Sequence, residues 1–163
     1  MVNRQKILKV ATLKKKIKQL RDDGKIIAWT NGCFDILHLG HVSYLESAKK
    51  KDRILIVGLN SDKSVKKIKG SKRPIVPENE RAGVLAGLAS VDYITIFDEE
   101  TPQRVIEDLK PDVLIKGADW KGKGIVGSEV VEANGGKIEY IKFIDQCSST
   151  NIIEKILKRF DGD

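Results

Sequence analysis

The sequence predicts a doubly wound α/β fold, in which a five-stranded parallel sheet with strand order 3-2-1-4-5 forms a single domain over residues 1–163. Two observations lead to this prediction. Five short segments rich in Ile, Leu and Val alternate along the chain with segments of helical periodicity. Parallel strands also need long crossover connections, which intervening helices supply. A chain of this length buries roughly 70% of its unfolded surface, which is enough for one ordinary core.

The first 24 residues are expected to form an amphipathic helix that precedes the sheet. Gly24 supplies the stop, and residues 25–30 then form a short apolar run that ends at Asn31-Gly32. A run of this kind, bounded by turn residues, indicates a buried strand. The apolar residues of the helix recur at spacings of three and four, at Ile7, Val10, Leu13, Ile17 and Leu20.

The remaining elements follow the same alternation. Strands are expected over residues 53–59, 93–97, 112–116 and 137–143. Helices are expected over residues 40–51, 61–67, 78–88 and 101–109, after residue 127, and from residue 148 or 149 onwards. Ser61, Thr101 and either Ser148 or Ser149 suit the N-caps of three helices, and Pro102 suits a first helical position. Residues 69–77 are interpreted as a basic loop, and residues 117–127, with four glycines, as a mobile loop.

The composition indicates a globular protein with anionic partners. The formal net charge of +7 favours phosphorylated molecules, nucleic acid or acidic lipid, and a lysine-rich surface without a specific partner is the alternative. No stretch approaches the roughly 20 apolar residues of a membrane span, and the N-terminus lacks the apolar centre of a secretory leader. Two cysteines, Cys33 and Cys147, are too few for a disulfide framework and are expected to be inert thiols. We therefore expect a cytoplasmic protein with no membrane partner.

The residues that best indicate chemistry follow the first strand. Ligands of doubly wound sheets bind beyond the carboxyl ends of the strands, at the point where the strand order reverses. His38 and His41 lie one turn apart at an expected helix start, where free N–H groups and the positive dipole end attract anions. Gly40 lets a phosphate approach the backbone. A structural histidine, or a metal-binding pair completed by Cys33 or Asp35, is the alternative. The full segment reads Thr30-Asn31-Gly32-Cys33-Phe34-Asp35-Ile36-Leu37-His38-Leu39-Gly40-His41.

The pattern Thr-x-x-x-Phe-Asp-x-x-His-x-Gly-His after a first strand resembles the signature of the HxGH nucleotidyltransferases, which have a Rossmann-like, cytidylyltransferase-like fold. Residues 58–65, 69–74, 91–92, 101–102, 110–119 and 148–153 further resemble the adenylyltransferase domain of ADP-heptose synthase. This resemblance implies transfer of AMP from ATP to D-glycero-β-D-manno-heptose 1-phosphate, giving ADP-heptose and pyrophosphate for lipopolysaccharide synthesis. Many members fuse this domain to a heptose-phosphate kinase that this chain lacks, so a separate kinase is expected. The resemblance also implies a homodimer and Mg²⁺ carried by ATP.

The resemblance assigns roles to the matching positions. His38, His41 and Lys49 are expected to be catalytic, and a solvated lysine at the helix end is the alternative for Lys49. Nucleotide binding is expected at Thr30, Asn31, Gly32, Cys33, Phe34, Gly40, Lys116, Gly117, Asp119, Ser149 and Thr150, and Trp120 is a candidate for stacking on a ring. Contacts with the triphosphate or the acceptor are expected at Asp35, Asn60, Asp62, Lys69, Lys72, Arg73 and Arg81, with helix capping as the alternative for Asp35 and Asp62. No metal site made by the protein itself is expected. The last family motif reads Ser-Thr-Thr, whereas this chain has Ser149-Thr150-Asn151, which leaves the hydroxyl contacts there open.

Other functions fit parts of the sequence. Glycerol-3-phosphate cytidylyltransferase and archaeal-type FAD synthetase share the early motif, but residues 58–65 and 110–119 favour the heptose branch. A basic nucleic-acid-binding module is compatible with the charge. Aromatic residues make up only 6% of the chain, however, and it has no helix-turn-helix or zinc knuckle, so no nucleic-acid partner is expected. A dinucleotide-dependent oxidoreductase would need Gly-x-Gly-x-x-Gly at the first turn, which is absent.

Overall fold

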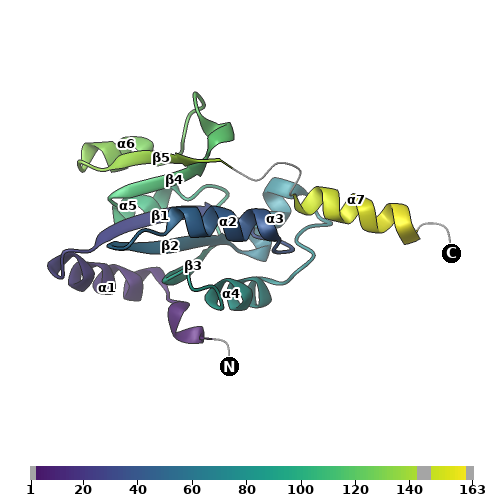
Figure 1. Ribbon diagram of the computed structural model, residues 1–163, viewed down its shortest axis with the longest axis horizontal. Helices are drawn as coiled ribbons and strands as arrows, with labels where there is room; N and C mark the ends of the chain where they lie inside the picture. Colours follow the sequence, from purple (N-terminus) through teal and green to yellow (C-terminus); the bar gives the residue numbers. More distant parts are fainter. Residues whose placement is uncertain (1–2, 143–147, 161–163) are drawn as a thin grey trace.

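A five-stranded, all-parallel sheet organises the computed structural model, which describes residues 3–142 and 148–160. The strand order is β3-β2-β1-β4-β5, as the sequence predicts. The chain therefore builds outward from β1 to β3 on one side and then crosses to β4 and β5 on the other, so the order reverses beside β1 (Figure 1). The strands are β1 (Ile26–Gly32), β2 (Arg53–Asn60), β3 (Tyr93–Phe97), β4 (Val113–Gly117) and β5 (Lys137–Ile141).

Helices connect the strands and cover both faces of the sheet. They are α1 (Val10–Asp22), α2 (Leu39–Ala48), α3 (Asp62–Lys69), α4 (Glu78–Ala86), α5 (Gln103–Leu109), α6 (Ser128–Ala133) and α7 (Ser149–Phe160), with the 3₁₀ helices η1 (Arg4–Lys6) and η2 (Ala118–Trp120). In Figure 1, α7 extends away from the sheet toward the C-terminus, and none of its residues is buried. Within the described part of the chain, no helix is long and apolar enough to cross a membrane.

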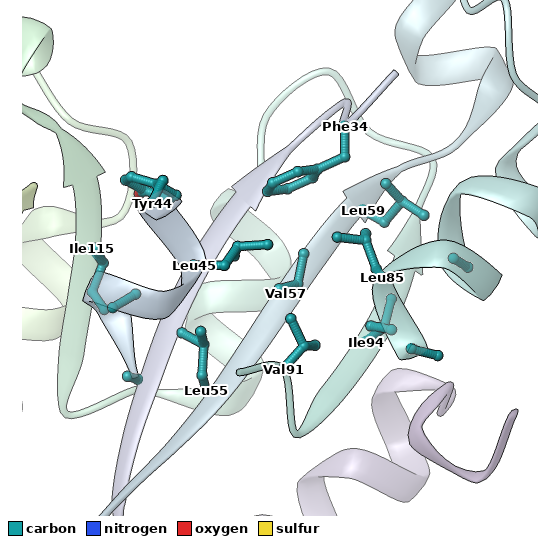
Figure 2. Close-up of a cluster of buried hydrophobic side chains, with 14 of the residues drawn as sticks. Phe34, Tyr44, Leu45, Leu55, Val57, Leu59, Leu85, Val91, Ile94 and Ile115 are labelled. Atoms are coloured by element: carbon teal, nitrogen blue, oxygen red, sulfur yellow. The ribbon is translucent and has the colours of Figure 1, made fainter. Parts of the chain in front are cut away.

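Two apolar cores lie on opposite faces of the sheet. On one face, side chains of α2 and α4, such as Tyr44, Leu45 and Leu85, pack on β1 and β2 (Figure 2). On the other face, α1 and α5 pack around Trp29, which is fully buried. A Cβ at Gly58 of β2 would lie only 2.2 Å from the Trp29 ring, so this position admits only glycine without repacking. The two cores fix β1 and β2, whose carboxyl ends carry the candidate site.

Several predicted boundaries need correction. Ile7 lies outside the first helix, because its segment is extended and pairs with Ile94 beside β3, and α1 begins only at Val10. Thr101 does not cap α5: Pro102 occupies the N-cap position, and no side chain caps this helix. Ser61, by contrast, does cap α3, since its hydroxyl accepts a hydrogen bond from the Ser64 N–H at 3.2 Å.

One predicted loop and one predicted strand also differ in detail. The glycine-rich segment 117–127 contains η2 and a buried Ile125, which anchors it to the core around Trp29. The fifth strand ends at Ile141, and Phe143, the predicted last residue, lies outside the described residues, as does Cys147.

Candidate active site

A cleft of about 550 Å³ opens beyond the carboxyl ends of β1, β2 and β4, where the predicted switch point lies. The β1–α2 turn forms its floor, the end of α3 and the following loop form one wall, and the end of β4 with η2 forms the other. Predicted site residues that line it are Asn31, Gly32, Cys33, Phe34, Asp35, His38, His41, Asn60, Lys69, Arg73, Lys116, Gly117, Ser149 and Thr150. The cleft is also lined by Tyr44, Ile68, Glu100, Val126 and Ser148, which are not predicted from the sequence as lining residues, and by Thr101 and Pro102, for which the sequence predicts only a role at a helix start.

The β1–α2 turn has an unusual backbone that shapes the floor of this cleft. Phe34 and Ile36 both lie in the left-handed region, with φ of 47° and 53°. For residues other than glycine, such conformations cost about 1–3 kcal/mol each and persist only where the surroundings enforce them. The buried Phe34 ring packs against His41, with ring centroids 5.2 Å apart. The turn therefore holds the start of α2 in a fixed position relative to β1.

The two histidines form a stacked pair at the start of α2. Their ring centroids are 3.9 Å apart with an interplanar angle of 27°, and His38 is the N-cap residue. The pKa of His41 is lowered to about 4, chiefly by burial and also by the proximity of His38, while Asp35 opposes the shift. Burial also lowers the pKa of His38. At neutral pH both rings are thus uncharged, and each offers one N–H donor and one lone pair.

The Nδ1 atoms of these histidines have unsatisfied hydrogen-bonding capacity. Both atoms are buried, and neither has a hydrogen-bond partner in the part of the chain that the structure describes. Buried polar atoms without partners are rare in native proteins. They lie beside the N-terminal backbone of α2, where an anion is favoured. The arrangement suits a bound group rich in oxygen atoms.

Asp35 anchors the basic loop. Its Oδ2 accepts hydrogen bonds from Arg73 Nε at 2.7 Å and from the Ile75 N–H at 2.9 Å, and its Oδ1 accepts one from the Val76 N–H at 2.9 Å. Burial alone would raise the pKa of Asp35, but the Val76 and Ile75 N–H groups and the Arg73 guanidinium outweigh it and lower the pKa. The capping alternative for Asp35 is therefore wrong, because its carboxylate binds the backbone of residues 75–76.

Arg81 links three segments around the site through hydrogen bonds of its guanidinium. Its guanidinium donates to the carbonyl oxygens of Cys33 at 2.5 Å, Asn60 at 2.9 Å and Val76 at 2.8 Å, and to Asp62 Oδ1 at 2.7 Å. Only 2% of Arg81 is exposed, and it does not line the cleft. The structure thus places Arg81 away from the surface expected to contact the triphosphate, where its side chain holds the loops that surround the cleft. Asp62 pairs with it and likewise does not line the cleft.

Lys49 also departs from its expected place. It is the C-cap residue of α2, and its Nζ donates to the carbonyl oxygen of Arg53 at 2.6 Å and pairs with Asp92. Arg53 begins β2, so this contact lies at the amino ends of the strands, opposite the cleft. Lys49 therefore does not lie beside the histidine pair in this structure, because α2 ends at Ala48 and the Lys49 side chain pairs with Asp92.

Four other predicted residues do not line the cleft: Thr30, Gly40, Lys72 and Asp119. Thr30 is fully buried, and its hydroxyl shares a hydrogen bond of 2.8 Å with the Tyr44 hydroxyl. The pKa of Tyr44 is raised to about 12, chiefly by burial and also by the charge of Asp119, while the hydrogen bond to Thr30 opposes the shift. Tyr44 lines the cleft and follows His41 by three residues on α2, so the helical spacing could have identified it.

Lys116 and Trp120 form the wall on the β4 side. Lys116 Nζ donates to Asn31 Oδ1 at 2.6 Å and lies 5.7 Å from the centroid of the Trp120 ring. Burial lowers the pKa of Lys116 to about 8. The Trp120 side chain is 42% exposed and lines the cleft, so its indole face is available to a ligand.

The start of α7 closes the cleft at its remaining side. Ser149 donates its hydroxyl hydrogen bond to the carbonyl oxygen of Asp35, so α7 is tied to the β1–α2 turn. Thr150 is exposed and also lines the cleft. Asn151, which replaces the family's second threonine, donates its backbone N–H to Ser148 Oγ at 3.0 Å.

The acidic side chains around the cleft are mostly engaged by neighbouring groups. No group of three His, Cys, Asp or Glu side chains among them is placed to hold a metal ion. Asp35 and Asp62 are engaged by Arg73 and Arg81. Cys33 is half-buried, and burial raises the pKa of its thiol against the opposing influence of Lys69 and Arg81.

Comparisons with known proteins agree with this geometry. The family model for cytidylyltransferase-like proteins matches residues 29–155. The chain is 56% identical over 137 residues to "Bifunctional protein HldE" of Geobacter metallireducens, covering 84% of this chain and 28% of that protein. It is 51% identical over 155 residues to the protein of the same name from Citrifermentans bemidjiense, covering 95% of this chain and 32% of that protein. The chain thus spans about a third or less of the length of these relatives.

A solved structure also resembles this chain. It is described as the lipopolysaccharide core biosynthesis protein from Thermoplasma volcanium, with a TM-score of 0.57 and 28% identity over 73% of this chain and 96% of that one. With the strand order, the histidine pair at the start of α2 and the extent of the match all in agreement, the chain belongs to the cytidylyltransferase-like family.

Proposed function

We propose that this chain transfers AMP from ATP to D-glycero-β-D-manno-heptose 1-phosphate, giving ADP-heptose and pyrophosphate. The observation that carries the proposal is the stacked, uncharged pair His38 and His41, whose buried Nδ1 atoms lack partners among the described residues at the start of α2. The choice of acceptor is supported by the identity of about half to relatives named HldE and by the likeness to a lipopolysaccharide core biosynthesis protein.

The chemistry requires little more than positioning and charge stabilisation. An oxygen of the sugar phosphate attacks the α-phosphorus of ATP, a new P–O bond forms, and the bond to the bridging oxygen breaks as pyrophosphate leaves with its electron pair. Because the acceptor is already an anion, the step needs no general base. The histidine N–H groups and the backbone at the start of α2 donate to phosphate oxygens as negative charge develops on them. Lys69 and Arg73, which line the same side of the cleft, face the charge of the triphosphate.

Mg²⁺ is expected to enter with ATP, since the described residues offer it no ligand cluster. Hard cations of this kind bind phosphate oxygens and water readily. Bound to the triphosphate, the ion would neutralise part of its charge. The contribution of the protein is to hold the phosphate chain against α2 and to exclude alternative orientations.

Three finer proposals concern partners and location. The acceptor must come from a kinase reaction, carried out by a separate protein or by another part of the same polypeptide, and the relatives are named as bifunctional proteins. An ATP-dependent enzyme of this kind would work in the cytoplasm. The family resemblance favours a homodimer, which sedimentation analysis of the purified protein tests directly.

A substrate screen tests the function. ATP and CTP are each combined with heptose 1-phosphate, glycerol 3-phosphate and FMN, and pyrophosphate release is measured. We expect release only with ATP and heptose 1-phosphate, whereas CTP with glycerol 3-phosphate, or ATP with FMN, would identify the other branches of the family. His41→Ala should lower kcat by roughly 10²–10³-fold, because one donor to the developing charge is lost. Near-normal turnover in that variant would refute the assignment of the histidine pair.

A further inference from the structure

Lys116 is a positive charge without a negative partner. Its Nζ contacts Asn31 Oδ1 at 2.6 Å, and it takes part in no ion pair among the residues that the structure describes. Arg73 pairs with Asp35 and Arg81 pairs with Asp62, whereas Lys69, which also joins no ion pair among the described residues, is exposed to solvent. A half-buried ammonium without a carboxylate is costly unless a ligand supplies the anion.

The cations of the cleft fall into two groups on opposite sides of β1. Lys69 ends α3 and Arg73 lies in the loop after it, on the side of the sheet that holds β2 and β3. Lys116 projects from the end of β4, on the other side. The histidine pair follows β1 and lies between them along the sheet. The cleft thus provides two separate places for anionic groups, with phosphate donors between them.

The proposed reaction brings two anions together. A triphosphate carries several negative charges and suits the side with the histidines, the start of α2 and two cations. The β4 side offers a single ammonium, a neutral amide and the exposed indole of Trp120. One ammonium beside a flat apolar surface matches a single phosphate attached to a ring.

From this division we infer that Lys116 binds the phosphate group of the acceptor, a sugar phosphate monoester, in place of the nucleotide contact that the family resemblance implies, and that Trp120 packs against its sugar ring. The inference rests on the proposed function, because it assigns one of the two substrates of that reaction to one wall of the cleft. The lowered pKa of Lys116, about 8, agrees with a group whose charge is incompletely compensated before substrate binds. Lys116 would then be a specificity residue for acceptors that carry a phosphate.

Steady-state kinetics of Lys116→Met test this assignment. Loss of one charge-assisted hydrogen bond should raise KM for the sugar phosphate roughly 10- to 100-fold, while KM for ATP changes less than about threefold. Lys123→Met is the matched control, because Lys123 Nζ lies 5.9 Å from the same Trp120 ring but does not line the cleft. The control should leave both KM values unchanged. A rise in KM for ATP alone, or equal rises for both substrates, would overturn the assignment.

A binding measurement separates this inference from the proposed function. Trp120 is the exposed tryptophan and Trp29 is fully buried, so tryptophan fluorescence reports on the cleft without turnover. Heptose 1-phosphate and ATP are titrated separately into the wild type, Lys116→Met and Lys116→Gln, each checked for folding by circular dichroism. We expect both variants to lose affinity for the sugar phosphate and to keep affinity for ATP, even if no pyrophosphate is released by the wild type. Unchanged sugar phosphate affinity in a folded variant would refute the inference.

Discussion

Replacing Arg81 by methionine separates a structural role for this side chain from direct contact with a substrate. Arg81 makes four hydrogen bonds, to three backbone carbonyl oxygens and to Asp62, from a position that is 2% exposed. Methionine has a similar length and fills most of the same space, so the chief change is the loss of these bonds. The three carbonyls belong to Cys33, Asn60 and Val76, in three different segments around the cleft.

The expected size of the effect follows from the burial of the charge. Removing one member of a buried, hydrogen-bonded ion pair typically costs about 3–5 kcal/mol, because the partner loses its compensation. Asp62 is about one third exposed and can recover some hydration, which favours the lower end of this range. For a chain of this size, 3–5 kcal/mol corresponds to a fall in Tm of roughly 6–20 °C.

Urea denaturation of Arg81→Met, followed by circular dichroism, measures the change. Arg104→Met is the matched control, since the Arg104 side chain is 79% exposed and its pair with Glu99 spans 3.9 Å. We expect this control to change the unfolding free energy by less than about 0.5 kcal/mol. An Arg81→Met protein of wild-type stability, with only its KM for ATP raised, would refute the argument and return Arg81 to the triphosphate site.

Two further predictions test the remaining assignments. Lys49→Met should lower the unfolding free energy by about 1–3 kcal/mol, because Asp92 loses its partner. KM for ATP should stay within twofold of the wild type. A large rise in KM for ATP would contradict the placement of Lys49 away from the cleft. The pKa of His41 falls from 6.5 to about 4 on folding, so the unfolded chain takes up its proton first, and stability is lost as pH falls from 6.5 toward 4. As pH falls across this range, the urea midpoint should decrease less steeply for His41→Gln than for the wild type. His38, which both proteins contain, adds a change of the same sign. Identical slopes for the two proteins would contradict the low pKa of His41.

The fold was largely predictable because apolar runs and helical spacing are local properties of the sequence. The strands begin and end within about three residues of their expected places, and the strand order follows from the alternation and the family resemblance. Ile7 was misplaced because its apolar side chain fits the helical spacing equally well, whereas its partner Ile94 is 87 residues away. Contacts of this kind depend on the assembled sheet and leave no local pattern.

The positions of site residues were predictable where a motif of side-chain types marks them. They were less predictable where a side chain bonds to backbone groups. The histidine pair follows from its motif and spacing. The roles of Arg81 and Asp35 do not, because their main partners are carbonyl and N–H groups that every residue carries. Lys49 shows a further limit. Its spacing from His41 is helical, but α2 runs from the carboxyl end of β1 back to the start of β2, so its last turn lies at the amino ends of the strands, away from the cleft.

The charge of the cleft before substrate binds affects both product release and the chemical step of the proposed reaction. The chain as a whole carries a net charge of +7, yet much of the positive charge at the site is neutralised or absent before substrate binds. Arg73 is paired with Asp35, and both histidines are uncharged at neutral pH. A wall of permanent charges would bind ATP and pyrophosphate tightly and would slow product release. Neutral donors stabilise most strongly the state in which charge develops on the transferred phosphate, and only that difference accelerates the chemical step.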